Sequence, residues 1–334
     1  MAEKLAAYIK ALGQGFLVGA GLAAYDRWAA GQADPLHSPL PGQGHFYDWR
    51  EARVFYKAHG EGHPVLLLHS IHVAASGWEM RHVHEFLAVN GFRVYTPDLP
   101  GFGLSTRPPR RYTHDLYTRF LRDFVRDVVG QEAVVVASGI TTSFVVAAAA
   151  GAPSLFGPLV LIAPVGIQRF HQRPLWGPVL EQLFRLPVLG HTMFNVLVSR
   201  PVLRWLLRHL LYLNAEQVTD VAVRYHYAVS HQPNARFAPA ALLGGALNRS
   251  IRQEFAALRQ PVLLVWGYRA RLVPPTDGPA FLQANPRAQL TGFDARLLPH
   301  DEQADQFNRY VLKWLQARLE EAGHGEQIRL RVVM

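Results

Sequence analysis

The sequence predicts an α/β fold in which a mostly parallel, doubly wound sheet carries an inserted helical cap. From about residue 50, short apolar strand patterns alternate with amphipathic helical patterns, which is typical of βαβ units. Only helical patterns occur between residues 165 and 259, and the alternation then resumes. We therefore expect four segments: an N-terminal apolar helix and linker (1–44), the first part of the core (45–164), the cap (165–259) and the second part of the core (260–334).

The positive charge of the chain is concentrated in the expected cap. The 334 residues include 34 Lys and Arg and 25 Asp and Glu, a net charge of +9. Residues 165–259 hold eleven Arg, no Lys and four acidic residues, so +7 of the total lies there. The absence of cysteine excludes disulfides and a cysteine nucleophile. We expect no metal or other cofactor, because His69 with His72 and His82 with His84 lack a third ligand.

An apolar stretch over residues 16–24 follows Lys4 and Lys10. It is shorter than the roughly 20 residues that span a bilayer. Two interpretations stay open: a helix that lies in a membrane interface, and a helix docked on the body of the protein. The expected location is the cytoplasm, with peripheral attachment to a membrane as the alternative, and the sequence leaves secretion open.

The elements of the core follow from hydrophobic periodicity and from capping residues. Residues 34–44 are rich in Pro and Gly and are expected to form a linker. We expect strands at 53–56, 63–70 and 92–97, a helix over 76–89, and an amphipathic helix that begins at Thr113 and ends at Gly130.

In the cap, apolar periodicity predicts helices at 175–186, 192–213 and 216–229, with a further helix toward Phe255. A strand is expected at 261–267. The last helix is expected over 303–321, with Phe307, Val311, Leu315 and Leu319 on one face.

A sharp turn between a strand and a helix is expected near Gly139. The β-branched run from Ala133 to Ala137 gives way to small residues, and an apolar, Ala-rich helix follows. The sequence Ala137-Ser138-Gly139-Ile140-Thr141 resembles the G-x-S-x-G nucleophile elbow of serine hydrolases, with glycine in place of the central serine.

Several motifs in the right order make residues 50–320 resemble the α/β-hydrolase superfamily, in its capped esterase, lipase and C–C hydrolase branch. His69-Ser70 stands where that family has the His-Gly oxyanion turn. Residues 98–105 resemble its D-x-x-G-x-G-x-S turn, and residues 298–303 resemble its closing P-H-x-E-Q run. Gly139 precedes Pro153 by 14 residues and Pro164 by 25, as the family's nucleophile does. The resemblance implies an α/β-hydrolase fold.

The catalytic residues that the resemblance implies are absent from their positions. Gly139 stands at the nucleophile, Ala270 at the acid and Leu297 at the histidine. Arg296 and Ser70 also stand where the family has glycine. From these departures we expect that no catalytic triad residue is retained and that hydrolase activity has been lost.

The residues expected around the pocket are His69, Ser70, Ile71, His72, Ser138, Ile140 and His300. The histidines are interpreted as structural, and the Ser138 hydroxyl is expected to bond the local backbone.

The leading hypothesis is a pseudoenzyme that serves as a binding or scaffold protein. Its partner would be a small apolar or acyl ligand, or a membrane surface contacted by the N-terminal helix and the basic cap. The alternative is an active carboxylic-ester hydrolase with a rearranged site, in which Ser138 or Ser143 would react. Nucleic-acid binding is not expected, because the basic residues are interleaved with aliphatic runs.

Overall fold

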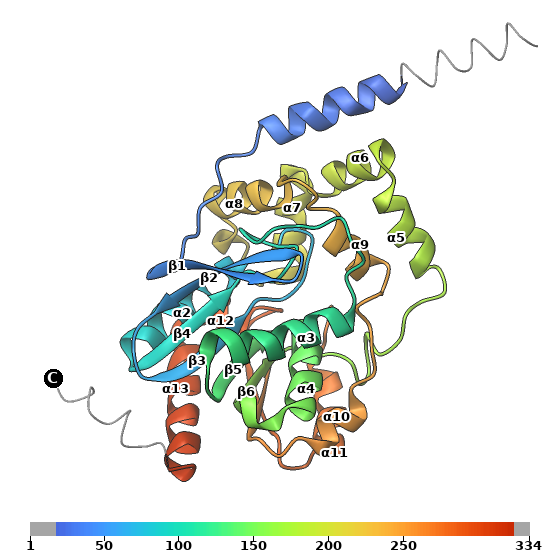
Figure 1. Ribbon diagram of the computed structural model, residues 1–334. Coiled ribbons are helices and arrows are strands. Elements are labelled where there is room, and N and C mark those ends of the chain that lie inside the picture. Colours follow the sequence, from blue (N-terminus) through green and yellow to red (C-terminus); the bar gives the residue numbers. More distant parts are fainter. Residues whose placement is uncertain (1–17, 324–334) are drawn as a thin grey trace, which may run out of the picture.

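The computed structural model describes residues 18–323. Within this range one eight-stranded sheet has the order β1-β2-β4-β3-β5-β6-β7-β8 (Figure 1). β2 pairs antiparallel with β1 and β4, and the other neighbours are parallel. The strands are β1 (Gln43–Trp49), β2 (Ala52–His59), β3 (His63–Leu68), β4 (Phe92–Pro97), β5 (Ala133–Ser138), β6 (Phe156–Ile162), β7 (Val262–Gly267) and β8 (Gln289–Phe293). The predicted α/β class with a mostly parallel sheet is confirmed.

The described α-helices of the core and the cap are α2 (Arg81–Val89), α3 (His114–Phe124), α4 (Thr141–Gly151), α5 (Gly177–Arg185), α6 (Val188–Leu197), α7 (Arg200–Leu206), α8 (Asp220–Ser230), α9 (Phe237–Leu243), α10 (Arg252–Ala257), α11 (Gly278–Ala284), α12 (Pro299–Glu302) and α13 (Ala304–Glu321). π-Helical turns extend α3 over Val125–Val129 and α7 over Leu207–Leu211. Helices α5 to α10 lie between β6 and β7 in the chain, within the residues expected to form the cap.

Alternate residues of the central strands pack into two cores on opposite faces of the sheet. Val134 and Val136 of β5 share a core with residues of α2 and α13. Val135 and Ala137 share the other core with residues of α3 and α4. A strand buried on both faces needs apolar side chains at every position, which explains the unbroken apolar runs of β3, β5 and β6.

The expected ends of the amphipathic helix are found. The Thr113 hydroxyl accepts a hydrogen bond from the Leu116 N–H at 3.1 Å, as an N-cap residue does. Gly130 ends the helix in the left-handed region at φ 75°.

Two expectations about the elements are wrong. The cap helix expected over 192–213 is broken, because α6 ends at Leu197 and α7 begins at Arg200. Pro201 explains the break: it has no N–H for a continuing helix, and it lies in the first turn of α7. Strands β1 and β8 were not predicted, and the expected linker runs into the start of β1. Both are edge strands with mixed burial, so their hydrophobic pattern is weak.

The described part of the N-terminal stretch is a helix over residues 18–31 that packs on the cap. Its buried Asp26 accepts hydrogen bonds from the Thr192 hydroxyl at 3.0 Å and the Asn195 amide at 2.9 Å, both on α6. This supports docking on the body of the protein; the expectations for residues 1–17 lie outside the described residues. Among residues 18–323, none of the helices combines the length and apolarity needed to cross a bilayer.

The loop after β4 is held by the carboxylate of Asp98. It accepts hydrogen bonds from the N–H groups of Gly77 at 2.6 Å and Leu104 at 2.7 Å. Gly103 lies so close that a Cβ added there would be 2.0 Å from Asp98 Cγ. The buried Asp98 side chain therefore holds both the start of the 3₁₀ turn at Gly77–Met80 and the loop that follows β4.

We predict that Asp98→Ala lowers the free energy of unfolding by about 1–3 kcal/mol, because the buried Gly77 N–H and the partly buried Leu104 N–H lose their acceptor. Urea unfolding measures the change. Asp48→Ala is the control: the Asp48 side chain is 88% exposed and its ion pair with Arg53 is 3.8 Å long, so we expect a change within about 0.5 kcal/mol. Equal effects of the two substitutions would contradict the role given to Asp98.

Candidate functional site

The turn between β5 and α4 has the backbone of a nucleophile elbow with a glycine at its apex. Gly139 has a φ of 58°, a conformation that glycine adopts without strain. Its N–H donates to the Ile162 carbonyl at 2.9 Å, which fixes the turn to β6. A Cβ placed on Gly139 would lie 2.1 Å from Ser70 Oγ and 3.0 Å from Ser70 Cβ. The Ser70 hydroxyl thus occupies the space that a side chain at the apex would enter.

Ser70 is held in this place by its backbone. It follows the end of β3, and its N–H donates to Glu79 Oε2 at 2.9 Å. His69 Nδ1 donates to the Ser70 carbonyl at 2.6 Å, while His69 Nε2 accepts from the Leu99 N–H at 3.0 Å. The backbone donor at Nε2 sets this tautomer. His69 is therefore a structural residue that orients the Ser70 peptide.

Glu79 and His300 form a buried pair beneath this turn. His300 Nε2 lies 3.3 Å from Glu79 Oε1, and both side chains are almost completely excluded from solvent. Burial raises the pKa of Glu79, but the interactions with His300, and to a smaller extent with His72 and His69, together outweigh it and leave the pKa below its usual value. The Glu79 carboxylate accepts the hydrogen bond from the Ser70 N–H and so holds the Ser70 backbone in place.

His72 is the imidazole that reaches the cavity. Its ring stacks on that of His226, with the centroids 5.8 Å apart. Loss of hydration in this enclosed site, with a smaller contribution from the neighbouring His226, lowers the pKa of His72 to about 3. The ring is therefore neutral at pH 7, and its Nδ1 accepts a long hydrogen bond from the Ala74 N–H at 3.3 Å. Only by giving up that bond can it take a proton, and then only as a weak base.

A cavity of about 290 Å³ lies over the elbow and is almost entirely apolar. The core contributes Ser70, Ile71, His72, Gly139, Ile140, Leu272, Val273, Leu297 and Leu298 to its lining, and residues 165–259 contribute Val165, Phe170, Leu211, Leu242 and Leu243. Among these lining residues there is no Arg, Lys, Asp or Glu. An uncharged group fits this cavity, since an unpaired carboxylate would lose its hydration there.

The residues expected around the pocket separate into two groups. Ser70, Ile71, His72 and Ile140 line the cavity, whereas His69, Ser138 and His300 are not among its lining residues. Ser138 is buried, and its Oγ has no hydrogen-bond partner, contrary to the backbone bond expected for it. The hydroxyl of Ser143 donates to the Ile140 carbonyl at 2.7 Å. Ser70 is therefore the hydroxyl that the structure brings to the elbow.

The loop at the position of the triad histidine connects the core with the cap. The Leu297 N–H donates to the Leu211 carbonyl at 3.1 Å. Arg296 donates to the carbonyls of Arg208, His209 and Tyr212 at 2.8 to 3.0 Å. Neutral Leu297 fills part of the cavity wall where the family has its histidine.

Ala270 is buried at the acid position, and its N–H donates to the Gly267 carbonyl at 3.1 Å. The neighbouring Arg269 pairs with Asp294 at 3.0 Å. The tight turn after β7 is thus kept without a carboxylate at that position.

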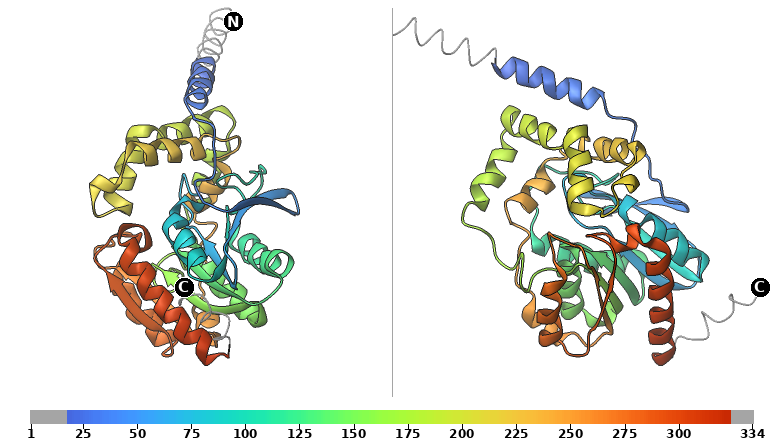
Figure 2. Two further views of the ribbon diagram at one scale, coloured as in Figure 1. Left: turned by 90° about the vertical axis from the view of Figure 1, so that its left-hand side faces the viewer. Right: turned by 180° about the vertical axis from the view of Figure 1, so that it is seen from behind.

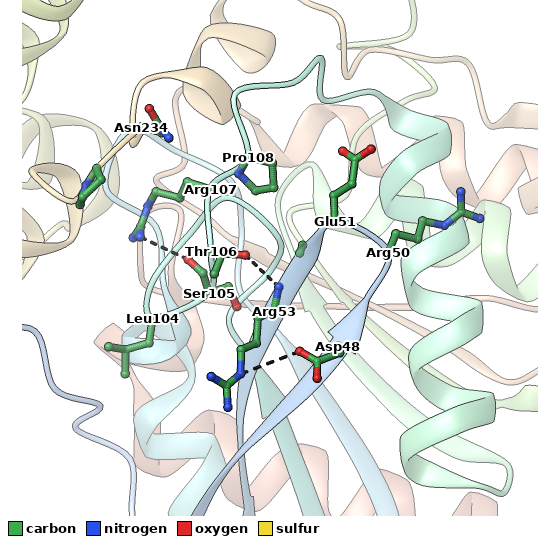
Figure 3. Close-up of a pocket in the computed structure, with 12 residues that line it drawn as sticks. Asp48, Arg50, Glu51, Arg53, Leu104, Ser105, Thr106, Arg107, Pro108 and Asn234 are labelled. Atoms are coloured by element: carbon green, nitrogen blue, oxygen red, sulfur yellow. Dashed lines mark hydrogen bonds and ion pairs between the residues drawn. The ribbon is translucent and has the colours of Figure 1, made fainter.

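A larger hollow, of about 710 Å³, lies between the β1–β2 hairpin and the loop after β4 (Figure 3). It shares no lining residue with the elbow cavity. Several of its polar groups bond one another: the Arg53 N–H donates to the Thr106 hydroxyl at 2.8 Å, the Arg53 side chain lies 3.8 Å from Asp48, and Arg107 donates to the Ser105 carbonyl at 3.2 Å. These contacts brace the loop, so the elbow cavity is the candidate site.

Comparison with known proteins agrees with this geometry. Residues 63–295 match the family described as alpha/beta hydrolase fold, and the chain belongs to that family. It is 28% identical over 280 residues to a 2-hydroxy-6-oxononadienedioate/2-hydroxy-6-oxononatrienedioate hydrolase of Pseudomonas putida, covering 80% of this chain and 92% of the relative. It is 24% identical over 277 residues to a 2-hydroxy-6-oxo-6-phenylhexa-2,4-dienoate hydrolase of Comamonas testosteroni (81% and 94%).

The solved enol-lactonase of Burkholderia xenovorans has the same fold, with a TM-score of 0.67 and 18% identity over 81% of this chain and 99% of that one. The comparisons contradict the expectation that this chain is a scaffold without activity, because its relatives are named as hydrolases. They support the alternative, a working hydrolase with a rearranged site.

We predict that Gly139→Ser destabilises the fold by about 1–3 kcal/mol, because the residue has a positive φ and the added Cβ approaches Ser70. Rotation of the Ser70 hydroxyl relieves the shorter contact but leaves the Cβ at 3.0 Å. In the double variant with Ser70→Gly the added side chain has room. Urea unfolding of both single variants and the double variant measures the coupling, and strictly additive changes would contradict the packing of Ser70 against Gly139.

A further prediction concerns the pH dependence of stability that His72 causes. Its folded-state pKa, about 3, lies below the unfolded value of 6.5. The contribution of neutral His72 to stability is therefore complete above about pH 6.5 and is lost as the pH falls toward 3. We expect His72→Asn to reduce the slope of unfolding free energy against pH between these values by up to about 1.4 kcal/mol per pH unit. The control is exposed His171→Asn, and equal slopes in all three proteins would contradict the burial of a neutral ring.

Proposed function

We propose that this protein is a carboxylic-ester hydrolase in which Ser70 is the nucleophile. The observation that carries the proposal is the position of Ser70 Oγ, 2.1 Å from where a Cβ at the elbow apex would lie. Relative to the family pattern, glycine and serine have exchanged places between the oxyanion turn and the elbow. The hydroxyl therefore reaches the same end of the cavity from β3 instead of β5.

The other groups around the cavity fit acyl transfer to Ser70. In the forward step Ser70 Oγ attacks the ester carbonyl, and its proton passes to His72 Nδ1, which gives up the 3.3 Å hydrogen bond that it accepts from the Ala74 N–H. The bond to the leaving alkoxide then breaks, and that oxygen takes the proton from His72. Water releases the acyl group from Ser70 in the second half of the reaction, and the products are a carboxylic acid and an alcohol.

The start of α4 can stabilise the oxyanion that forms in both steps. The N–H groups of Gly139, Thr142 and Ser143 donate to the carbonyls of Ile162, Gly139 and Ile140, so the Ile140 N–H, whose residue lines the cavity, is the group offered to the oxyanion. Because the low pKa of His72 makes it a weak base, we expect slow turnover and a preference for esters with activated leaving groups.

The lining of the cavity favours a neutral acyl group. Its wall is formed by leucine, isoleucine, valine and phenylalanine side chains, with no charged partner for a carboxylate among them. The dienoates in the names of the relatives carry carboxylates, and such a group would be buried here without a counter-ion. A short or medium-length apolar acyl chain is the substrate class that this cavity supports.

Hydrolysis of p-nitrophenyl esters from acetate to octanoate, together with labelling by a fluorophosphonate probe, tests the proposal. We expect hydrolysis above the uncatalysed rate and a single label on Ser70, both abolished in Ser70→Ala. The control Ser138→Ala leaves both unchanged, because Ser138 is not among the cavity-lining residues. Labelling of Ser138 or Ser143, or full activity of Ser70→Ala, would contradict the assignment of the nucleophile. If the protein neither hydrolyses these esters nor is labelled by the probe, the proposed function is wrong.

A further inference from the structure

The helix over residues 18–31 buries Asp26 and Ala29 against the cap and leaves Trp28 exposed. Asp26 is buried against α6, where Thr192 and Asn195 donate to its two oxygens. The Tyr227 hydroxyl donates to the Ala29 carbonyl at 2.8 Å and holds the same side of the helix on α8. The opposite side exposes Ala24, Arg27 and Trp28, and Val18 is exposed at the start of the helix. A helix docked on a protein in water more often buries its tryptophan and exposes its aspartate.

Exposed apolar side chains continue on the neighbouring cap helices. Leu175 and Trp176, just before α5, are 100% and 60% exposed, and Val179 of α5 is 64% exposed. Leu189 and Val196 of α6 lie one above the other, seven residues apart, and are also exposed. Twelve of the eighteen exposed large hydrophobic residues in the described chain lie in the helix over 18–31 or in residues 165–259.

These helices lie near one another in space. Figure 1 and the right-hand view of Figure 2 both place the helix over 18–31, α6 and α5 at the end of the molecule away from α11 and α13. We call their exposed side chains the apolar cap face: Val18, Ala24, Trp28, Leu175, Trp176, Val179, Leu189 and Val196. The hydrogen bonds of Asp26 fix the rotation of the first helix, so Ala24, Arg27 and Trp28 are held outward.

We propose that the apolar cap face docks on the surface of a bilayer that contains anionic lipid. Residues 165–243, which include α5 to α9, hold eight Arg against three acidic residues. Arginines place their charge among lipid headgroups while their aliphatic stems lie along apolar surface. Tryptophans such as Trp28 and Trp176 are favoured at the boundary between water and hydrocarbon.

Charge favours this occupant over a second copy of the chain. If the apolar cap faces of two copies paired, two positively charged segments would repel each other. An anionic lipid surface would instead neutralise the positive charge next to the apolar cap face. The contact is peripheral, since none of the described helices can cross the membrane. This inference does not depend on the proposed esterase activity, because the apolar cap face shares no residue with the lining of the elbow cavity.

Flotation of the full chain with vesicles tests the proposal. We expect the protein to float with vesicles of phosphatidylglycerol and phosphatidylcholine, and to stay at the bottom with phosphatidylcholine alone. Raising the salt to about 0.5 M NaCl should weaken the binding, because it screens the headgroup charge. No binding to the anionic vesicles, or equal binding to both lipids, would overturn the proposal.

Two triple variants locate the contact. In the first, Trp28→Ser, Trp176→Ser and Val179→Ser remove exposed apolar side chains from the apolar cap face, and we expect binding to fall about tenfold or more. In the second, Val89→Ser, Leu290→Ser and Tyr310→Ser remove exposed side chains from α2, β8 and α13, and we expect binding to stay as in the wild type. Circular dichroism checks that both variants fold.

Unchanged binding of the first variant, or an equal loss in both, would show that this face is not the contact. A dimer in light scattering that disappears in the first variant would assign the apolar cap face to a second copy instead and would overturn the proposal.

Discussion

The close approach of Ser70 and Gly139 is the constraint around which this site is built. β3 and β5 are parallel neighbours, so their carboxyl ends meet at one edge of the sheet. Two residues that follow these ends compete for one small volume, and only one of them can carry a side chain into it. Glycine at the apex allows serine in the oxyanion turn. For the same steric reason, a larger side chain at position 70 or 139 should restrict which residues fit at the other position.

Hydrogen bonds to Glu79 and His69 hold the backbone of Ser70 in this arrangement. Glu79 accepts from the Ser70 N–H, and His69 donates to the Ser70 carbonyl, so both ends of the residue are held. The residues at the two remaining triad positions have structural roles. Leu297 forms part of the apolar wall and bonds Leu211 of the cap, and Ala270 closes a tight turn. The apolar wall favours neutral substrates, and the nearby neutral imidazole of His72 can carry a proton.

Much of the fold could be predicted from the sequence, because it depends on local patterns. Buried parallel strands appear as unbroken apolar runs, and Thr113 and Gly130 mark the ends of a helix where they are found. The edge strands β1 and β8 escaped prediction because one of their faces is exposed and their pattern is mixed. The break between α6 and α7 had a signal in Pro201, which the apolar periodicity across 192–213 obscured.

The site was harder to predict than the fold. The resemblance to the family placed Ser70, Ile71, His72 and Ile140 near a pocket, and all four line the cavity. It also led to the conclusion that activity was lost, because Gly139, Ala270 and Leu297 were compared with the triad one position at a time. The substitutions at Ser70 and Gly139 were both visible, but the link between them is spatial. The two residues lie far apart in the sequence and meet only because β3 and β5 are adjacent.

The central claim is that the hydroxyl of Ser70 has taken the place of the elbow serine. A crystal structure of the protein after reaction with a fluorophosphonate tests it most directly. The account predicts phosphonate density continuous with Ser70 Oγ, beside Gly139 and facing the start of α4. Phosphonate density on any other side chain, or a Ser70 hydroxyl turned away from Gly139 in the unreacted crystal, would contradict it.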